Sequence, residues 1–333
     1  MGPILEEFKV HRKELLLTTH QLYTKALESK HYAIPEKPFE IRITAQGGVG
    51  THREHQFLME HYNLNSVGWG TPFLLVPEVT NVDKQTMDLL CKANSKDLLL
   101  SNISPLGMPF NTLKQNTKDI EKRQYIDEGI PGSPCTKQYG ELFEEFNGKA
   151  LCTGSRQYQK IKLKELAEKK LDPEMHSKEY NKIIEKSCIC VGLGTAALLV
   201  NDIETKSEGP GVSICPGPNM AYFSSIISLS EMVDHIYGRS NVIKRDDRPN
   251  MFIHELKLYI DFLKNKIDES TKPWTDKQKE YFESFKNNLN DGVRYYKDMI
   301  SELKTKFDDL SISIKKDIAP LELELSRINL NLY

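Results

Sequence analysis

The sequence predicts an α/β fold that passes into a mostly helical region, and three observations support this. Residues 4–70 give the order helix, strand, helix, strand. Residues 120–250 mix charged, helix-like segments with turns rich in proline and glycine. Beyond these, apolar residues recur at alternating spacings of three and four almost to the end, which is typical of helices. The chain therefore divides into three predicted regions, residues 1–118, 119–250 and 251–333.

The first region contains a predicted βαβ unit. An amphipathic helix over residues 4–29 ends at the segment 32–40, because its two prolines cannot continue a helix. Residues 39–45 then alternate apolar and polar side chains as a strand does. A stretch with helical spacing over 52–63 leads to a second apolar run near Val67. A short crossover of this kind predicts two neighbouring parallel strands.

The third region predicts an antiparallel helical hairpin. Apolar residues repeat from Ile253 to Ile267 and again from Phe282 to Leu310, and the turn "ESTKPW" lies between the two runs. The apolar seam of the hairpin could pack on this chain or form an interface with a second subunit.

Composition narrows the class of protein. With 333 residues, 39% hydrophobic and 28% charged, the chain has the make-up of a folded globular protein. Its formal charge of -2 gives no basic field that would attract nucleic acid or anionic lipid. No apolar run approaches the roughly 20 residues that span a bilayer, and the N-terminal stretch lacks the layout of a signal peptide. We therefore expect a cytoplasmic protein that binds neither nucleic acid nor a membrane.

Two glycine-rich turns follow the two predicted strands. The turn "QGGVGT" lies between a strand and a helix, and "GWGT" lies at the end of the next strand. Glycine allows a phosphate to approach converging backbone N–H groups, and parallel strands deliver successive turns to the same face. One anion-binding pocket could therefore be lined by Gly47, Gly48, Gly68, Gly70 and Thr71. Two ordinary βα turns are the alternative.

The residues that follow these turns carry a family resemblance. After "GWGT" come Phe73, Leu74 and Glu78, and then Ala93, Asp97, Gly107, Pro109 and Asn111. This order over roughly residues 39–118 resembles the closing part of the nitronate monooxygenase family, formerly the 2-nitropropane dioxygenases, and the related FMN-dependent enoyl reductases. The resemblance implies the last βα units of a TIM-barrel-like flavoprotein domain. It also implies that the glycine pair and the Gly-Thr hold the phosphate of FMN in an oxidoreductase.

The chain departs from this family in two respects. A barrel of this type needs about 200 residues or more, whereas 38 residues precede the first predicted strand. The catalytic histidine of the family has no counterpart, so the sequence assigns neither a catalytic residue nor a substrate. Three explanations remain open: a C-terminal portion of an enzyme, one subunit of a split enzyme, or a degenerate barrel with another use. The expected partner is a second subunit that supplies the missing strands, or another copy in a homo-oligomer. The alternative function is that of a non-enzymatic binding or assembly subunit.

The second region contains five cysteines in or beside short turns. Thiolates in such turns can bind zinc or an iron–sulfur cluster, with backbone N–H groups aimed at the sulfur. The candidate ligands are Cys135, Cys152, Cys188, Cys190 and Cys215. Buried free thiols are the alternative, because these spacings lack a diagnostic CxxC pair.

Overall fold

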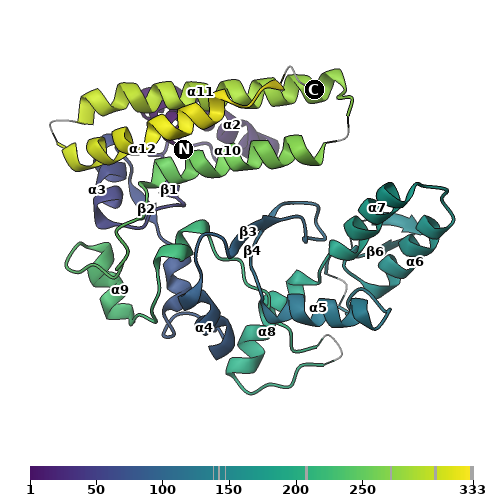
Figure 1. Cartoon of the computed structure of the whole chain (residues 1–333). Coiled ribbons are helices and arrows are strands. Elements are labelled where there is room, and N and C mark those ends of the chain that lie inside the picture. Colours follow the sequence, from purple (N-terminus) through teal and green to yellow (C-terminus); the bar gives the residue numbers. More distant parts are fainter. Residues whose placement is uncertain are drawn as a thin grey trace. The chain divides into compact units, whose positions relative to one another are not determined.

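The computed structural model describes residues 1–137, 139–141, 143–146, 148–206, 209–270, 272–303 and 306–330. The chain forms two compact units (Figure 1). The first unit consists of Met1–Trp69 together with Asp246–Tyr333, and the second consists of Gly70–Arg245. This division differs from the three consecutive regions that the sequence predicts, because the two ends of the chain belong to one unit.

The first unit begins with two helices where the sequence predicts one. Helix α1 (Gly2–Val10) and helix α2 (Arg12–Ser29) meet at His11, whose N–H donates to the carbonyl of Glu7 at 2.9 Å. Leu5 of α1 is buried, whereas Leu22 of α2 is exposed. None of the residues of α2, all of which the structure describes, is buried. Helix α2 therefore adds no buried side chain to the core of the unit, whereas α1 contributes Leu5.

The predicted βαβ unit is confirmed. Strands β1 (Thr44–Gln46) and β2 (Ser66–Gly68) are parallel, with Ala45 opposite Val67, and helix α3 (His52–His61) connects them. Each strand is three residues long, and every sheet in the described residues has two strands, so these residues contain no closed barrel. The structure is mixed α/β with mostly helix, and the expectation of a TIM-barrel remnant is not confirmed.

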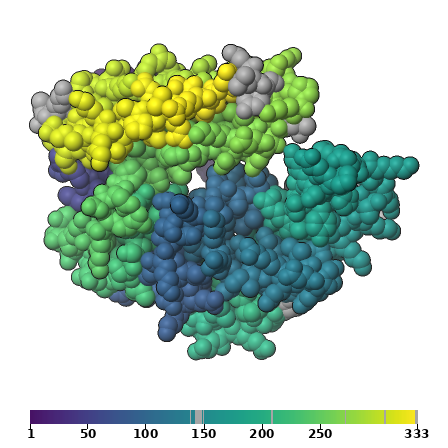
Figure 2. Space-filling view, viewed as in Figure 1, coloured from purple at the N-terminus to yellow at the C-terminus, as the bar shows by residue number. Residues whose placement is uncertain are grey.

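In the part of residues 246–333 that the structure describes, there are three further helices, rather than the two of a hairpin. They are α10 (Met251–Glu269), α11 (Asp276–Leu303) and α12 (Asp308–Ser326), which run side by side (Figure 1). Where the sequence predicts a single helix through Leu310, the described residues form two, one ending at Leu303 and the next beginning at Asp308. Helix α12 lies at the surface of the unit (Figure 2), where Ile312 and Leu323 are exposed, while its Ile314 is buried.

The core of the first unit joins α3 to the C-terminal helices. The ring of Phe57 on α3 packs edge-to-face on Tyr62, Phe252 and Phe307, with centroid distances of 5.5, 5.8 and 5.1 Å. Phe57 and Phe252 are each 1% exposed. Aromatic pairs of this geometry stabilise a fold beyond the burial of their area. These contacts explain why residues 246–333 belong with the N-terminal residues.

The second unit is built from short elements. Its described residues include two 3₁₀ helices, η1 (Thr71–Leu75) and η2 (Pro218–Tyr222). The strands among these residues form two antiparallel pairs, β3 (Leu98–Ser101) with β4 (Phe110–Leu113), and β5 (Phe143–Phe146) with β6 (Lys149–Leu151). Its helices are α4 (Lys84–Lys92), α5 (Thr117–Asp127), α6 (Arg156–Ala167), α7 (Pro173–Glu185), α8 (Ile189–Val200) and α9 (Leu229–Ile236).

Within the described residues, no single helix has the length and apolar character to cross a membrane. Helices α7 and α8, bent by 40° where they meet, pass that test only when taken together.

Candidate functional site

The residues predicted to form one phosphate pocket lie in both units. Gly47, Gly48 and Gly68 belong to the first unit, whereas Gly70 and Thr71 belong to the second. Gly47 and Gly48 have φ values of +107° and +76°, which side-chain-bearing residues rarely adopt. The glycine pair is therefore required by the turn that leads from β1 towards α3.

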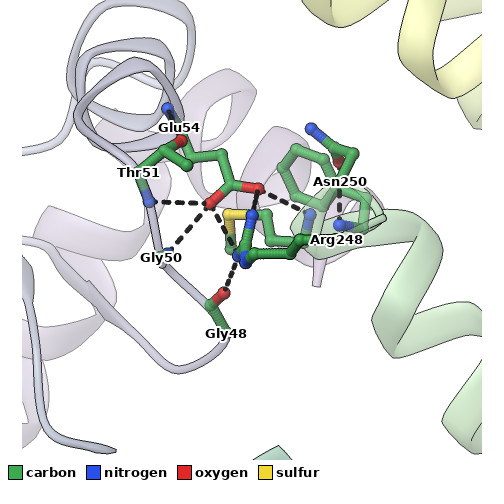
Figure 3. A network of polar contacts seen from close by, with 8 residues as sticks. Gly48, Gly50, Thr51, Glu54, Arg248 and Asn250 are labelled. Atoms are coloured by element: carbon green, nitrogen blue, oxygen red, sulfur yellow. Dashed lines mark hydrogen bonds and ion pairs between the residues drawn. The ribbon is translucent and has the colours of Figure 1, made fainter. Parts of the chain in front are cut away.

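The backbone N–H groups at the end of this turn donate to the chain's own Glu54 carboxylate (Figure 3). The N–H groups of Gly50 and Thr51 lie 2.9 and 3.2 Å from Oε2. The N–H of Met251, the first residue of α10, lies 2.8 Å from Oε1. Nη1 and Nη2 of Arg248 lie 2.8 and 2.9 Å from Oε1 and Oε2. These five N–H groups, from two helix N-termini and one guanidinium, surround an internal anion.

This network is buried and leaves little space. The side chains of Glu54 and Arg248 are 3% and 6% exposed. Nη2 of Arg248 also donates to the Gly48 carbonyl at 2.9 Å. A Cβ placed on Gly50 would lie 2.6 Å from the guanidinium of Arg248, so the last glycine of "GGVG" makes room for that side chain. The N–H groups of Gly50 and Thr51 at the end of the turn therefore have an internal carboxylate as their partner.

Neither Glu54 nor Arg248 was predicted from the sequence to be a site residue. Thr51 and Glu54 form a capping box, since each side chain accepts from the backbone N–H of the other. The spacing Thr-x-x-Glu before a helix signals this arrangement and could have identified Glu54. The segment "RDDRPN" offers no comparable signal for Arg248.

Four of the five candidate cysteines line one small cavity in the second unit. The cavity has a volume of about 10 Å³, and its walls include Tyr139, Gly140 and Ser155 together with Cys135, Cys152, Cys188 and Cys190. This volume is room for roughly one water molecule. Cys215 is not among the lining residues. It is exposed, and its thiol forms a hydrogen bond with the backbone of Asn111.

Close crossings of the backbone bring these cysteines together. The N–H of Ser133 donates to the Gly154 carbonyl at 3.0 Å, and the N–H of Arg156 donates to the Ser133 carbonyl at 2.9 Å. A Cβ on Gly132 would lie 2.6 Å from Cα of Arg156, and a Cβ on Gly154 would lie 2.9 Å from the Ser187 carbonyl. The cysteine-bearing segments approach this closely because both crossing residues are glycine.

Two of the thiols interact directly. Cys188 is the N-cap of α8, and Cys190 lies in its first turn. A hydrogen bond from the Cys188 thiol lowers the pKa of Cys190 to about 7. The same bond, together with burial, raises the pKa of Cys188 far above its usual range, and the charge of Lys118 partly offsets that rise. Burial raises the pKa of Cys152.

Cys188 also lines a second small cavity. Its walls include Lys118, Glu121 and Tyr125. Nζ of Lys118 lies 2.7 Å from Oε2 of Glu121, and both side chains are buried. The hydroxyl of Tyr125 donates to Oε1 of the same carboxylate at 3.0 Å.

The four thiols of the cavity do not form a metal-ligand set in the structure. Among the described residues, no group of three or more His, Cys, Asp or Glu side chains is placed to hold a metal ion. Comparison of the chain with protein-family models, with curated proteins and with solved structures found no match.

Proposed function

We propose that this chain is a metal-binding subunit that holds one thiophilic ion of the zinc class. The supporting observation is that four thiols from three separate segments line one cavity. Four cysteine thiolates are a common ligand set of structural zinc sites. The four ligands are Cys135, Cys152, Cys188 and Cys190.

The size of the cavity favours a single ion over an iron–sulfur cluster. Its volume of about 10 Å³ leaves room for one small particle between the sulfurs. Thiolates approach zinc to about 2.3 Å, so the four side chains would turn inward about their Cα–Cβ bonds. A multi-iron cluster would have to push the segments apart, which the tight crossings at Gly132 and Gly154 oppose.

We propose a cytoplasmic location for this function. All six cysteines are free thiols, and a reducing compartment keeps thiolates available for a metal.

Titration of the reduced, metal-free full chain with Co²⁺ under anaerobic conditions tests the proposal. Cobalt stands in for zinc, and a tetrahedral thiolate site gives intense visible absorption. We expect one Co²⁺ per chain. Cys152→Ser should weaken binding at least about 100-fold, or roughly 2.7 kcal/mol. Cys215→Ser is the matched control and should bind as the unaltered chain does. The absence of a thiolate spectrum, or equal losses in the two variants, would refute the proposal.

We propose FMN binding by an oxidoreductase as a second function. The resemblance over residues 39–118 supports it, and so does the parallel pairing of β1 and β2, which brings Gly47, Gly48 and Gly68 to adjacent strand ends. A second subunit would supply the remaining strands and the catalytic residues. The Glu54 carboxylate weighs against this function, because a phosphate would compete with it for the N–H groups of Gly50 and Thr51.

Colour separates the two functions. A flavoprotein is yellow as purified and releases FMN when it is denatured. A colourless chain that leaves the fluorescence of added FMN unchanged would remove the second function for this polypeptide.

A further inference from the structure

Helices α1, α10 and α11 line a groove of about 470 Å³ in the first unit. Ligand pockets in proteins usually have volumes of about 300–1,000 Å³ and mostly apolar walls. The walls of this groove are mainly apolar, and their side chains include Pro3, Ile4, Leu256, Tyr259, Phe285 and Leu289. The lining residues all belong to the first unit, so the groove shares no residue with the proposed metal site in the second.

Aromatic rings reach the groove from two helices. Tyr259 of α10 and Phe285 of α11 have ring centroids 6.4 Å apart, with 67° between the ring planes. Tyr259 is 46% exposed, and Ile4 of α1 is 58% exposed. Aromatic rings attract flat apolar groups and also cations. The groove therefore offers accessible surface to a ligand with an apolar body.

Gly292, which also lines the groove, lies inside helix α11. Its backbone is helical and its φ is not positive, so the conformation does not require glycine. Apart from its chain neighbours and the backbone of its own helix, no atom lies within 4 Å of an added Cβ, so close packing does not require glycine either. Glycine weakens a helix interior relative to alanine. Its effect here is to leave the backbone of α11 open to a molecule in the groove.

The charged side chains among the lining residues are the carboxylates of Glu255 and Asp291. Oε2 of Glu255 accepts from the ammonium group of Met1 at 2.8 Å, so one carboxylate of the groove already binds an amine. Oδ1 of Asp291 accepts from the guanidinium of Arg294 on the same helix. The side chain of Asp291 is 60% exposed, and its second oxygen can accept from a ligand. A positive charge on the ligand complements these groups.

We propose that this groove binds a small organic cation, an ammonium group carried on an aromatic or aliphatic body. The body lies against Tyr259, Phe285 and the open backbone at Gly292, and the ammonium group donates to the carboxylate of Asp291. A neutral analogue lacks the ion pair, and an anion is repelled by both carboxylates. The groove therefore selects amines over alcohols and acids of the same shape.

Fluorescence anisotropy of 2-(1-naphthyl)ethylamine mixed with the full chain tests the proposal. The matched probes are the neutral 2-(1-naphthyl)ethanol and the anionic 1-naphthylacetate. At low salt we expect the amine to bind at least about threefold more tightly than the alcohol, a modest factor because the ion pair is exposed. The acid should bind most weakly, and added salt should reduce the differences.

Asp291→Asn tests the charge. It should lower the affinity for the amine to that for the alcohol and leave the affinity for the alcohol unchanged. Asp298→Asn is the matched control, because Asp298 is exposed on the same helix but does not line the groove. Equal losses of amine binding in the two variants would overturn the role of Asp291.

Gly292→Leu tests the place of binding. It should weaken the binding of amine and alcohol at least about tenfold, because the leucine side chain occupies the space of the naphthyl group. Leucine is a better helix former than glycine, so the urea midpoint of the variant should not fall. Gly292→Ala, which should weaken binding at least about twofold, serves if the leucine variant fails to fold.

The outcomes decide both parts of the proposal. An alcohol or acid that binds as tightly as the amine would overturn the class of ligand. Amine binding that is unchanged in the folded Gly292 variants would overturn the site, and so would an unaltered chain that does not bind the amine.

Discussion

The guanidinium of Arg248 donates two parallel hydrogen bonds to the carboxylate of Glu54, Nη1 to Oε1 at 2.8 Å and Nη2 to Oε2 at 2.9 Å. The two residues are 194 positions apart in the sequence. The pair ties the start of α3 to the segment that leads into α10. Because Glu54 also accepts from backbone N–H groups at both helix starts, its charge is shared among several partners. A buried ion pair is tolerated when its hydrogen bonds are satisfied in this way.

Glu54→Gln should destabilise the first unit by about 3–5 kcal/mol, because Arg248 would remain buried without a countercharge. Urea unfolding followed by tryptophan fluorescence measures this loss. The chain has two tryptophans, Trp69 and Trp274, and both lie in the first unit, so the signal reports on that unit.

Asp309→Asn is the control for this prediction. Asp309 accepts from Arg53 at 2.9–3.1 Å, but its side chain is 57% exposed. Loss of an exposed pair costs about 0–1 kcal/mol. An effect of Glu54→Gln as small as that of the control would contradict the role assigned to the buried pair.

His254 should make the first unit sensitive to mild acid. Burial, and then the charge of Arg248, lower the pKa of His254 to about 4, and the ordinary value is about 6.5. Between these values the unfolded chain binds a proton that the native chain does not. The stability is therefore complete above about pH 6.5 and falls towards pH 4, by up to about 3 kcal/mol.

Replacement of His254 by the non-titrating Asn tests this pH dependence. We expect a smaller difference between the urea midpoints at pH 7.5 and pH 5 than in the unaltered chain. His11→Asn, at an exposed histidine, should leave the difference unchanged. The same pH dependence in all three proteins would show that His254 does not cause it.

Gly154→Ala should disrupt the cysteine cavity. The new Cβ would lie 2.9 Å from the Ser187 carbonyl, inside normal contact distance. We expect a loss of about 1–3 kcal/mol in the second unit and at least tenfold weaker metal binding. All six cysteines lie in the second unit, so the reactivity of the thiols in rising urea follows its unfolding.

Gly194→Ala is the matched control. Gly194 lies inside α8, and apart from its chain neighbours and the backbone of its own helix no atom lies within 4 Å of an added Cβ. Alanine should stabilise the helix there by about 0.8–1.0 kcal/mol. If both variants behave alike, the close crossing at Gly154 does not hold the cavity together.

Some of the fold could be predicted because its signals are local. Alternation before the first glycine turn and helical spacing after it were enough for the βαβ unit and its parallel strands. The end of α11 at Leu303 could not be predicted, because the apolar spacing continues through Phe307 and Leu310 without a break. The two units could not be predicted either, since the contact of Phe57 with Phe252 joins residues far apart in the chain.

For the candidate sites, too, local signals could be predicted from the sequence and contacts between distant residues could not. The turns around the cysteines predicted all five as candidate ligands. No local signal in the sequence shows that Cys215 lies outside the cavity that the other four line. That separation depends on where the backbone crosses at Gly132 and Gly154. The buried pair of Glu54 and Arg248 could not be predicted from the glycine turns, because it joins residues far apart in the chain.

X-ray absorption spectroscopy at the zinc edge of the zinc-loaded chain tests the central claim most directly, because it counts the sulfur neighbours of the ion. The four-cysteine site predicts one zinc per chain with four sulfurs at about 2.3 Å. It also predicts three sulfurs and one lighter atom in Cys152→Ser. A zinc surrounded by nitrogen and oxygen, or a chain that retains no metal, would contradict the site.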